Sequence, residues 1–182
     1  MKFIHEIRGK VVVRLYKGWI KRGQRVLDVG CGDGTVSGII KKKFGCDVKC
    51  TDIRNYIRND LPFSLMKDDK HLPFKNKSFD IVMLNDVLHH TEKQSELFRE
   101  CLRVGKRVLV VETQPSIIET ILDYVLNWLH RYNDMPIPLT QKRFPEWISF
   151  FRKYDPNVKG RICLATLYPS PYPLTHFSFN IG

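Results

Sequence analysis

Residues 25–36 combine a short apolar run with three closely spaced glycines. The segment reads Arg25-Val-Leu-Asp-Val-Gly-Cys-Gly-Asp-Gly-Thr-Val36, so Gly30, Gly32 and Gly34 come directly after the apolar run. A buried strand, a glycine-rich turn and a helix N-terminus together present backbone N–H groups and a positive dipole end, which suits a nucleotide-like ligand. The alternative is an ordinary strand-to-helix turn whose glycines serve only the backbone geometry.

Two details of this loop narrow the ligand. A dinucleotide fingerprint requires a third glycine three residues after the second, and Thr35 occupies that position counted from Gly32. Asp28 adds a carboxylate just before the turn, where it would repel a pyrophosphate and attract a cationic group. S-adenosylmethionine carries an ammonium and a sulfonium. The loop and Asp28 therefore favour S-adenosylmethionine over a dinucleotide.

Polar side chains also follow the other apolar runs. Asp52 ends a predicted strand about twenty residues past the loop, where an acidic side chain can accept hydrogen bonds from both ribose hydroxyls. Its alternative role is to cap a following helix. Further strand ends carry Asp68, Asp69, Asn85, Asp86 and Glu112. Because the carboxyl ends of parallel strands meet at one edge of a sheet, we expect these groups to converge on one ligand site.

The elements that would position these residues alternate along the chain. We predict strands over 26–29, 47–51, 63–67, 79–84, 107–111, 158–164 and 176–181, and helices over 4–20, 35–44, 92–104, 115–131 and 144–154. Strands that alternate with helical connections and right-handed crossovers form an α/β fold. The predicted fold is therefore a doubly wound, mostly parallel seven-stranded sheet with helices on both faces. The first helix is expected to cover the ligand pocket.

Length and composition fit one globular domain over residues 1–182. The chain is 43% hydrophobic and 27% charged, which is ordinary for a domain of 182 residues. We divide it into an N-terminal helix (1–23), a cofactor-binding core (24–112), a substrate-side helical cap (113–157) and the last two strands (158–182). The five cysteines lack metal-ligand spacing, so we expect no metal site and reduced thiols in a cytoplasmic protein. No transmembrane run is expected, although peripheral membrane contact stays open.

The formal net charge of +11 favours anionic partners such as nucleic acid or an acidic membrane surface. The basic residues are nevertheless spread along the chain, and Lys41, Lys42 and Lys43 form the tightest run. That run falls at a predicted helix end, where cations suit the helix dipole. A solvated basic face is therefore the favoured interpretation, with nucleic-acid binding as the alternative.

These motifs resemble the class I S-adenosylmethionine-dependent methyltransferases, in particular the type 11 group that includes ubiquinone- and menaquinone-biosynthesis-like enzymes. Residues 26–34 are similar to the first motif of the family, 68–74 to its D-A-E-x-L-P-F segment and 78–90 to its fourth motif. The resemblance implies a Rossmann-like methyltransferase fold. It also implies cofactor contacts from Asp28, Gly30, Cys31, Gly32, Asp52, Ile53, Asp68, Asp69 and Asn85.

Two departures from the family pattern bear on the substrate. Asp69 and Lys70 replace the usual pair of a small and an acidic residue near the adenine. The fourth motif also differs from the D/N-P-P-Y/F type that is linked to amino-nitrogen methylation of adenine, cytosine or glutamine. The motifs are therefore specific for the cofactor and uninformative about the acceptor.

The resemblance implies an enzyme that moves a methyl group from S-adenosylmethionine to a small-molecule or lipid-like acceptor by in-line displacement, leaving S-adenosylhomocysteine. A general base is needed only if the acceptor must lose a proton, and His90 and Asp86 are our candidates, with His89 and His176 as further histidines to consider. Two alternatives stay open: an RNA or protein acceptor, which the net charge would suit, and a protein that binds the cofactor without turnover.

Overall fold

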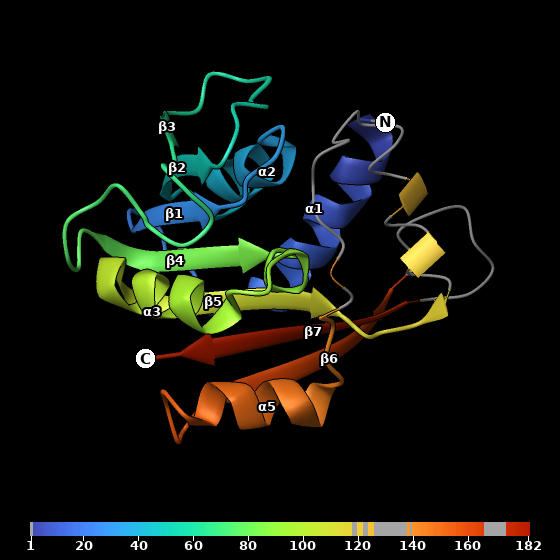
Figure 1. Cartoon of the computed structure of the whole chain (residues 1–182). Coiled ribbons are helices and arrows are strands. Elements are labelled where there is room, and N and C mark those ends of the chain that lie inside the picture. The colour runs from blue at the N-terminus through green and yellow to red at the C-terminus, as the bar shows by residue number, and fades with distance from the viewer. Residues whose placement is uncertain (1, 118–119, 122–123, 126–137, 139, 166–173) are drawn as a thin grey trace.

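The computed structural model describes residues 2–117, 120–121, 124–125, 138, 140–165 and 174–182. Within them the chain forms a seven-stranded sheet in the order β3-β2-β1-β4-β5-β7-β6 (Figure 1). The strands are β1 (Arg25–Val29), β2 (Asp47–Asp52), β3 (Phe63–Leu65), β4 (Phe79–Asn85), β5 (Gly105–Thr113), β6 (Lys159–Ala165) and β7 (Leu174–Ile181). β7 pairs antiparallel with both β5 and β6, and the other pairings among these strands are parallel. The predicted doubly wound, mostly parallel sheet is confirmed.

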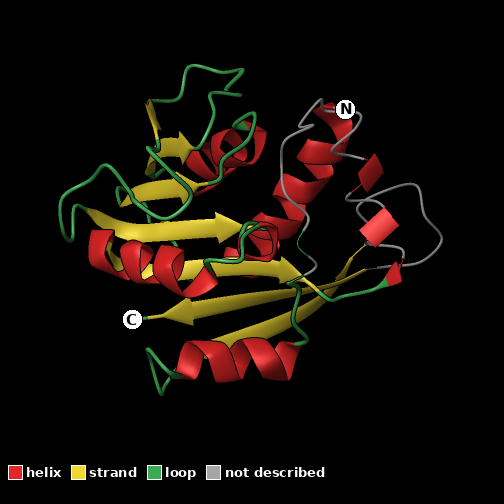
Figure 2. Ribbon diagram, viewed as in Figure 1, coloured by secondary structure: helices red, strands yellow, loops and turns green. Residues whose placement is uncertain are grey.

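Helices cover both faces of the sheet, as predicted (Figure 2). They are α1 (Lys2–Tyr16), α2 (Thr35–Phe44), the short 3₁₀ helix η1 (Leu88–His90), α3 (Gln94–Val104) and α5 (Phe144–Arg152). Successive residues of a strand point to opposite faces, so Ile81 and Met83 of β4 join the core under α1 and α2, whereas Val82 and Leu84 join the core under α3 and α5. Burial on both faces explains the continuous apolar runs in the sequence.

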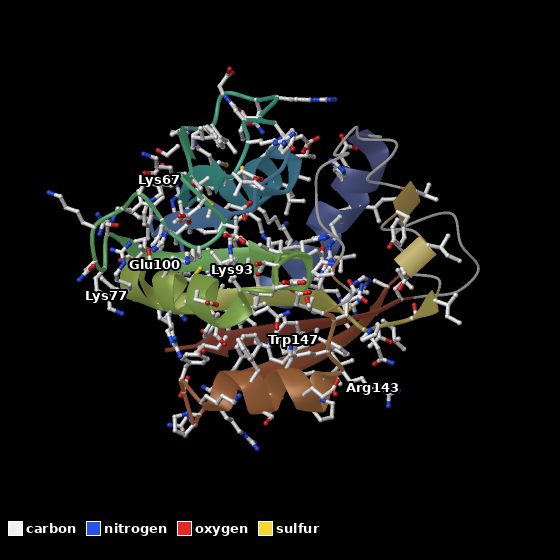
Figure 3. The ribbon with its side chains drawn as sticks, in the orientation of Figure 1. Lys67, Lys77, Lys93, Glu100, Arg143 and Trp147 are labelled. Atoms are coloured by element: carbon white, nitrogen blue, oxygen red, sulfur yellow. The ribbon has the colours of Figure 1, made fainter. Side chains whose placement is uncertain are left out.

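α5 belongs to the second of these cores. Its Trp147 ring stacks on Phe151 at 5.4 Å between centroids, and Phe151 packs on Phe98 of α3 and Phe179 of β7. Figure 3 shows Trp147 directed from α5 toward the sheet. This part of the predicted substrate-side cap therefore helps to form the core. Most of the helix predicted over 115–131 lies outside the described residues, so the cap stays a prediction.

α1 ends at Tyr16, earlier than predicted, because Gly18 adopts a left-handed φ of 82°. Trp19 belongs to the core under α1 and lies beneath the Arg161 guanidinium, which is 4.0 Å from the centroid of its ring. Gly9 lets α1 pack closely on α2, since a Cβ there would collide with Ile39. Among the described helices, none is long and apolar enough to cross a membrane.

Candidate functional site

The glycine loop after β1 needs its glycines for both backbone conformation and space. Gly30, Gly32 and Gly34 have φ values of 70°, 53° and 77°, a region that other residues rarely adopt. A Cβ at Gly30 would lie 2.6 Å from Cγ2 of Val87, and one at Gly34 would lie 2.7 Å from Cδ1 of Ile57. The loop therefore brings bare backbone to the sheet edge, as a cofactor cradle requires.

Asp52 lies at the carboxyl end of β2 and is hydrogen-bonded to this loop. Its Oδ2 accepts the Gly32 N–H over 3.0 Å, and its Oδ1 accepts the Ile53 N–H over 2.8 Å. Burial raises the pKa of the Asp52 carboxyl, although the backbone N–H donors act in the opposite direction. Ile53, directly after it, is 42% exposed and presents apolar surface beside the carboxylate. The pair offers an acceptor for hydroxyls next to an apolar wall.

Asp28 is the centre of a buried hydrogen-bond network that joins four elements. Its carboxylate accepts Ser37 Oγ of α2 over 2.5 Å and Asn85 Nδ2 of β4 over 3.2 Å. The Asn85 amide oxygen in turn accepts the hydroxyl of Tyr16 in α1 over 2.9 Å. Burial raises the pKa of Asp28 to about 7, and the hydrogen bonds from Ser37 and Asn85 partly offset this. A cationic ligand group at this edge would favour the ionised carboxylate.

Asp86, one of the two predicted bases, is ion-paired with Arg8 of α1. Burial alone would raise its pKa, but the neighbouring basic groups, with the Arg8 guanidinium foremost, outweigh burial and lower it. The residue also has a left-handed φ of 56°, and its Oδ1 accepts the Thr113 hydroxyl over 3.3 Å. A carboxylate held in this way is a weak proton acceptor, so the geometry favours a positioning role for Asp86.

Arg8 also contacts His176, and this contact sets the tautomer of the imidazole. Nη1 of Arg8 lies 2.9 Å from Nδ1 of His176, and a guanidinium can only donate. Nδ1 is therefore the acceptor, the ring is neutral, and Nε2 carries the hydrogen that faces the Ala165 carbonyl at 3.3 Å. Burial, with help from the Arg8 charge, lowers the pKa of His176 to about 4. These contacts commit His176 to a structural hydrogen-bond network.

The adjacent histidines of η1 differ in their surroundings. His89 is buried, and its Nδ1 lies 2.5 Å from Oε2 of Glu112 at the end of β5. The other carboxylate oxygen of Glu112 accepts the Leu88 N–H over 2.9 Å. His90 is partly exposed, and its ring centroid lies 4.1 Å from that of His89. The buried His89–Glu112 pair thus forms a fixed support for His90, the second predicted base.

Asp68 and Asp69 follow β3 and make their contacts away from the Asp28 network. Asp68 accepts the backbone N–H groups of Lys70 and His71 and pairs with the His71 ring at 2.8 Å. That hydrogen bond from His71 is the main reason why the pKa of Asp68 falls to about 2. Asp69 pairs with Lys93 at 3.0 Å. Their predicted contact with an adenine ring stays a prediction.

Cys31 is buried within the glycine loop. The neighbouring Cys50 thiol and burial both raise the pKa of the Cys31 thiol far above its usual range. A thiol that stays protonated is a poor nucleophile, so Cys31 is expected to contribute its backbone groups to the site and not a reactive thiol.

Three residues of the site escaped the sequence prediction: Arg8, Tyr16 and Ser37. Arg8 and Tyr16 fall at a spacing of eight on α1, with Val12 between them, and all three are buried. A basic side chain on the apolar side of an amphipathic helix is the signal that could have drawn attention to Arg8. Ser37 offered no comparable signal.

An open parallel sheet with a glycine-rich loop and acidic strand ends at one edge defines a Rossmann-like cofactor-binding domain. Residues 27–108 match the model of the type 11 family, whose description is "Methyltransferase domain". This segment is therefore a class I methyltransferase domain of that family, in agreement with the resemblance of its motifs.

Two curated relatives are similar over about half of this chain. The methyltransferase GfsG of Streptomyces halstedii is 30% identical over 109 residues, which cover 51% of this chain and 39% of that protein. The sterol 24-C-methyltransferase erg6 of Schizosaccharomyces pombe is 34% identical over 103 residues, covering 50% and 27%. The matched segments thus span less than half of either relative's length.

Solved structures show the same fold over nearly the whole chain. A SAM-dependent methyltransferase from Archaeoglobus fulgidus superposes with a TM-score of 0.69 and 16% identity, covering 97% of this chain and 93% of that one. Phosphoethanolamine N-methyltransferase 2 from Haemonchus contortus, in complex with phosphomonomethylethanolamine and S-adenosylhomocysteine, gives a TM-score of 0.66 at 16% identity, covering 95% and 51%. At these identities the likeness concerns the fold alone.

Proposed function

We propose that this chain binds S-adenosylmethionine at the carboxyl edge of β1, β2 and β4 and transfers its methyl group to a small-molecule or lipid-like acceptor. The observation that carries the proposal is Asp52, whose buried carboxylate is hydrogen-bonded to the N–H of Gly32 in the glycine loop over 3.0 Å. An acidic side chain that faces a bare-backbone loop suits a ribose next to a chain bearing an ammonium and a sulfonium.

The residues of this edge fit each part of the cofactor. Asp52 would accept the ribose hydroxyls, and Ile53 would pack on one face of the adenine. The loop backbone at Gly30, Cys31 and Gly32 would line the amino-acid part, and Asp28 would hold its ammonium. Asp68 and Asp69 would approach the adenine edge, as the family resemblance implies, after Asp68 exchanges its hydrogen bond to His71 for one to the ligand.

The chemistry asks little of the protein beyond alignment. Bound S-adenosylmethionine supplies a methyl carbon activated by a sulfonium, and in-line displacement leaves S-adenosylhomocysteine. Asn85 would border the methyl, since its amide is held between Tyr16 and Asp28. His90, supported by the His89–Glu112 pair, would take the acceptor's proton where one must leave. The geometry favours His90 over Asp86, which is ion-paired with Arg8.

A small or lipid-like acceptor is favoured for two reasons. One relative is named a sterol 24-C-methyltransferase, and one structural neighbour is in complex with phosphomonomethylethanolamine. In addition, the exposed cations on α1 and α2 lie mainly toward the opposite edge of the sheet, away from the methyl site. An RNA acceptor at the active site and a cofactor-binding protein without turnover are the alternatives.

Calorimetry with S-adenosylmethionine tests the cofactor half of the proposal. The wild-type chain should bind in the micromolar to sub-millimolar range, and Asp52→Ala should weaken binding at least tenfold because the ribose loses its acceptor. Asp47→Ala is the matched control, since Asp47 is an exposed carboxylate at the amino end of the same strand. Equal affinity of Asp52→Ala and wild type would refute the ribose assignment.

Release of S-adenosylhomocysteine tests the acceptor half. The wild-type chain is incubated with S-adenosylmethionine and separate pools of phosphoethanolamine-type, sterol-type and RNA acceptors. Product release with a small or lipid-like pool supports the proposal. Release with RNA alone would establish the RNA alternative, and tight cofactor binding with no release from any pool would favour a non-catalytic protein.

A further inference from the structure

One side of the molecule is rich in exposed cations and poor in acids. Residues 7–27 and 34–46 hold no Asp or Glu, so every charged side chain in these two segments is basic. We call the exposed cations of these segments the basic face, and exclude Arg25, which pairs with Asp80. The basic face comprises Lys10, Arg14, Lys17, Lys21, Arg22, Lys41, Lys42 and Lys43.

The fold brings these cations together. Lys10, Arg14, Lys17 and Lys21 recur at intervals of four, three and four residues, so they follow the exposed side of α1 and the turn after it. That turn meets the end of α2, where Gly23 N–H donates to the Gly45 carbonyl over 2.9 Å. Lys41, Lys42 and Lys43 at the end of α2 therefore lie next to the cations of α1 and of the turn after it.

The cations of the basic face are not neutralised within the protein. None of the eight forms an ion pair with any residue that the structure describes. By contrast, α3 on the opposite face mixes its charges, and Arg103 there pairs with Glu100 at 2.7 Å. The helix dipole accounts for the lysines at the end of α2 and for Arg14 in the last turn of α1, but it does not account for Lys10 or for the cations after the end of α1. Mutual repulsion among these cations favours an external anion.

The position of the basic face separates it from the methyl site. Arg25 and Asp47 begin β1 and β2 and lie opposite each other at the amino edge of the sheet, close to the turn after α1 and the end of α2. The glycine loop lies at the other end of β1, about 16 Å away for five residues of strand. A small acceptor cannot contact both sites, whereas an extended polyanion can occupy the basic face alone.

We propose that the basic face is a docking surface for the phosphate backbone of a nucleic acid, which it binds without reading the base sequence. Lys10 and Arg14 lie about 6 Å apart along the axis of α1, and Lys17 and Lys21 continue the row into the turn after Tyr16, so the basic face is long enough to meet several phosphates of a duplex. Exposed aromatic side chains that could stack on bases are absent from the described parts of α1 and α2, which fits backbone contact.

A membrane surface fits these observations less well. Helices that lie on membranes combine cations with an apolar side that inserts into the bilayer. The apolar side of α1 is buried against the sheet, through Val12, Leu15 and Tyr16 among others. The large apolar side chains that are exposed within the described residues, such as Ile53 and Leu164, lie on other elements.

Fluorescence anisotropy with a labelled short RNA duplex tests the proposal, using the full chain. We expect binding whose log Kd changes with log salt at a slope of about 4–5 in magnitude, as four to six phosphate contacts would give. The variant Lys41→Gln/Lys42→Gln/Lys43→Gln should weaken binding at least tenfold. The matched control, Arg99→Gln/Arg152→Gln/Lys153→Gln, removes the same charge from exposed positions on α3 and α5 and the turn after it.

Circular dichroism and S-adenosylmethionine affinity verify that both variants fold, since neither touches the proposed cofactor site. Three results would overturn the proposal: no RNA binding, binding that ignores salt, or equal loss in the two variants. Sedimentation with vesicles that contain phosphatidylserine completes the test. Vesicle binding without RNA binding would replace the nucleic acid by a membrane surface, and this too would overturn the proposal.

Discussion

Asn85 donates from Nδ2 to Oδ1 of Asp28 over 3.2 Å and so joins the ends of two adjacent parallel strands, β1 and β4. The contact holds a carboxylate whose pKa burial has raised to about 7. Asp28 is therefore expected to lose its proton near neutral pH, in the place where the cationic end of the cofactor would lie. Its charge state links stability and ligand binding.

The raised pKa of Asp28 predicts a pH-dependent stability. Between its ordinary pKa of 3.8 and about 7, the folded state binds more protons at Asp28 than the unfolded state does. This contribution therefore falls as pH rises through that window. Asp28→Asn should gain stability relative to wild type by several degrees of Tm between about pH 5 and about pH 8, where about 1 kcal/mol corresponds to about 2–4 °C. Thermal melts of both proteins without cofactor, at about pH 5 and about pH 8, measure the difference in Tm.

The same variant should bind S-adenosylmethionine about tenfold more weakly at high pH, because an ionised Asp28 would hold the ammonium. Wild-type affinity should rise with pH through about 7, and affinity of Asp28→Asn should not. Asp47→Asn serves as the exposed control. A Tm gap that is the same at both pH values would contradict the assignment.

The Arg8–Asp86 ion pair predicts strong coupling between α1 and the end of β4. Arg8→Met and Asp86→Asn should each cost about 2–4 kcal/mol of unfolding free energy, because each leaves a largely buried charge without its partner. The double variant should recover part of that loss. A double-mutant cycle in urea measures the coupling.

The control for this cycle is Arg25→Met with Asp80→Asn, a pair 3.9 Å apart at the opposite edge in which the arginine side chain is exposed. Its coupling should stay below about 1 kcal/mol. Equal coupling in the two cycles would mean that the Arg8–Asp86 pair contributes no more than a surface contact.

The His89–Glu112 pair predicts a defined tautomer. A carboxylate only accepts, so His89 should carry its hydrogen on Nδ1, which lies 2.5 Å from Glu112. Glu112→Gln keeps an acceptor for the Leu88 N–H but turns an amide donor toward His89, which should move the hydrogen to Nε2. Nitrogen NMR of labelled histidine distinguishes the two forms. An unchanged His89 spectrum in Glu112→Gln would show that Glu112 does not set the tautomer.

The close approach of Gly30 to Val87 predicts a steric cost that can be relieved. Gly30→Ala should destabilise the fold by about 1–3 kcal/mol, since it forces a left-handed φ of 70° on alanine and a contact of 2.6 Å. Adding Val87→Ala should restore the steric part only. Gly18→Ala is the control, because its φ is 82° but no atom lies near its Cβ. If Val87→Ala brought no recovery, the cost would come from φ alone.

Most of the fold could be predicted from the sequence because its signals are local. The apolar runs of β1, β4 and β5 and the glycine loop appear in consecutive residues, and the βαβ order then restricts the topology. The ends of elements were predicted less accurately, since the third strand ends at Leu65 and α1 ends at Tyr16. Single contacts and glycine φ values determine where an element ends. The position of Asp52 relative to the loop also followed from the order of the strands.

What the sequence by itself determined is the class of ligand and the edge that would bind it, since Asp28, Gly30 and Asp52 owe their positions to strands that any doubly wound sheet aligns. The tertiary structure alone decided the partners of the polar groups. Arg8 lies 168 residues from His176 and 2.9 Å away in space. Such a pairing depends on how α1 crosses the sheet, and no local pattern encodes that crossing.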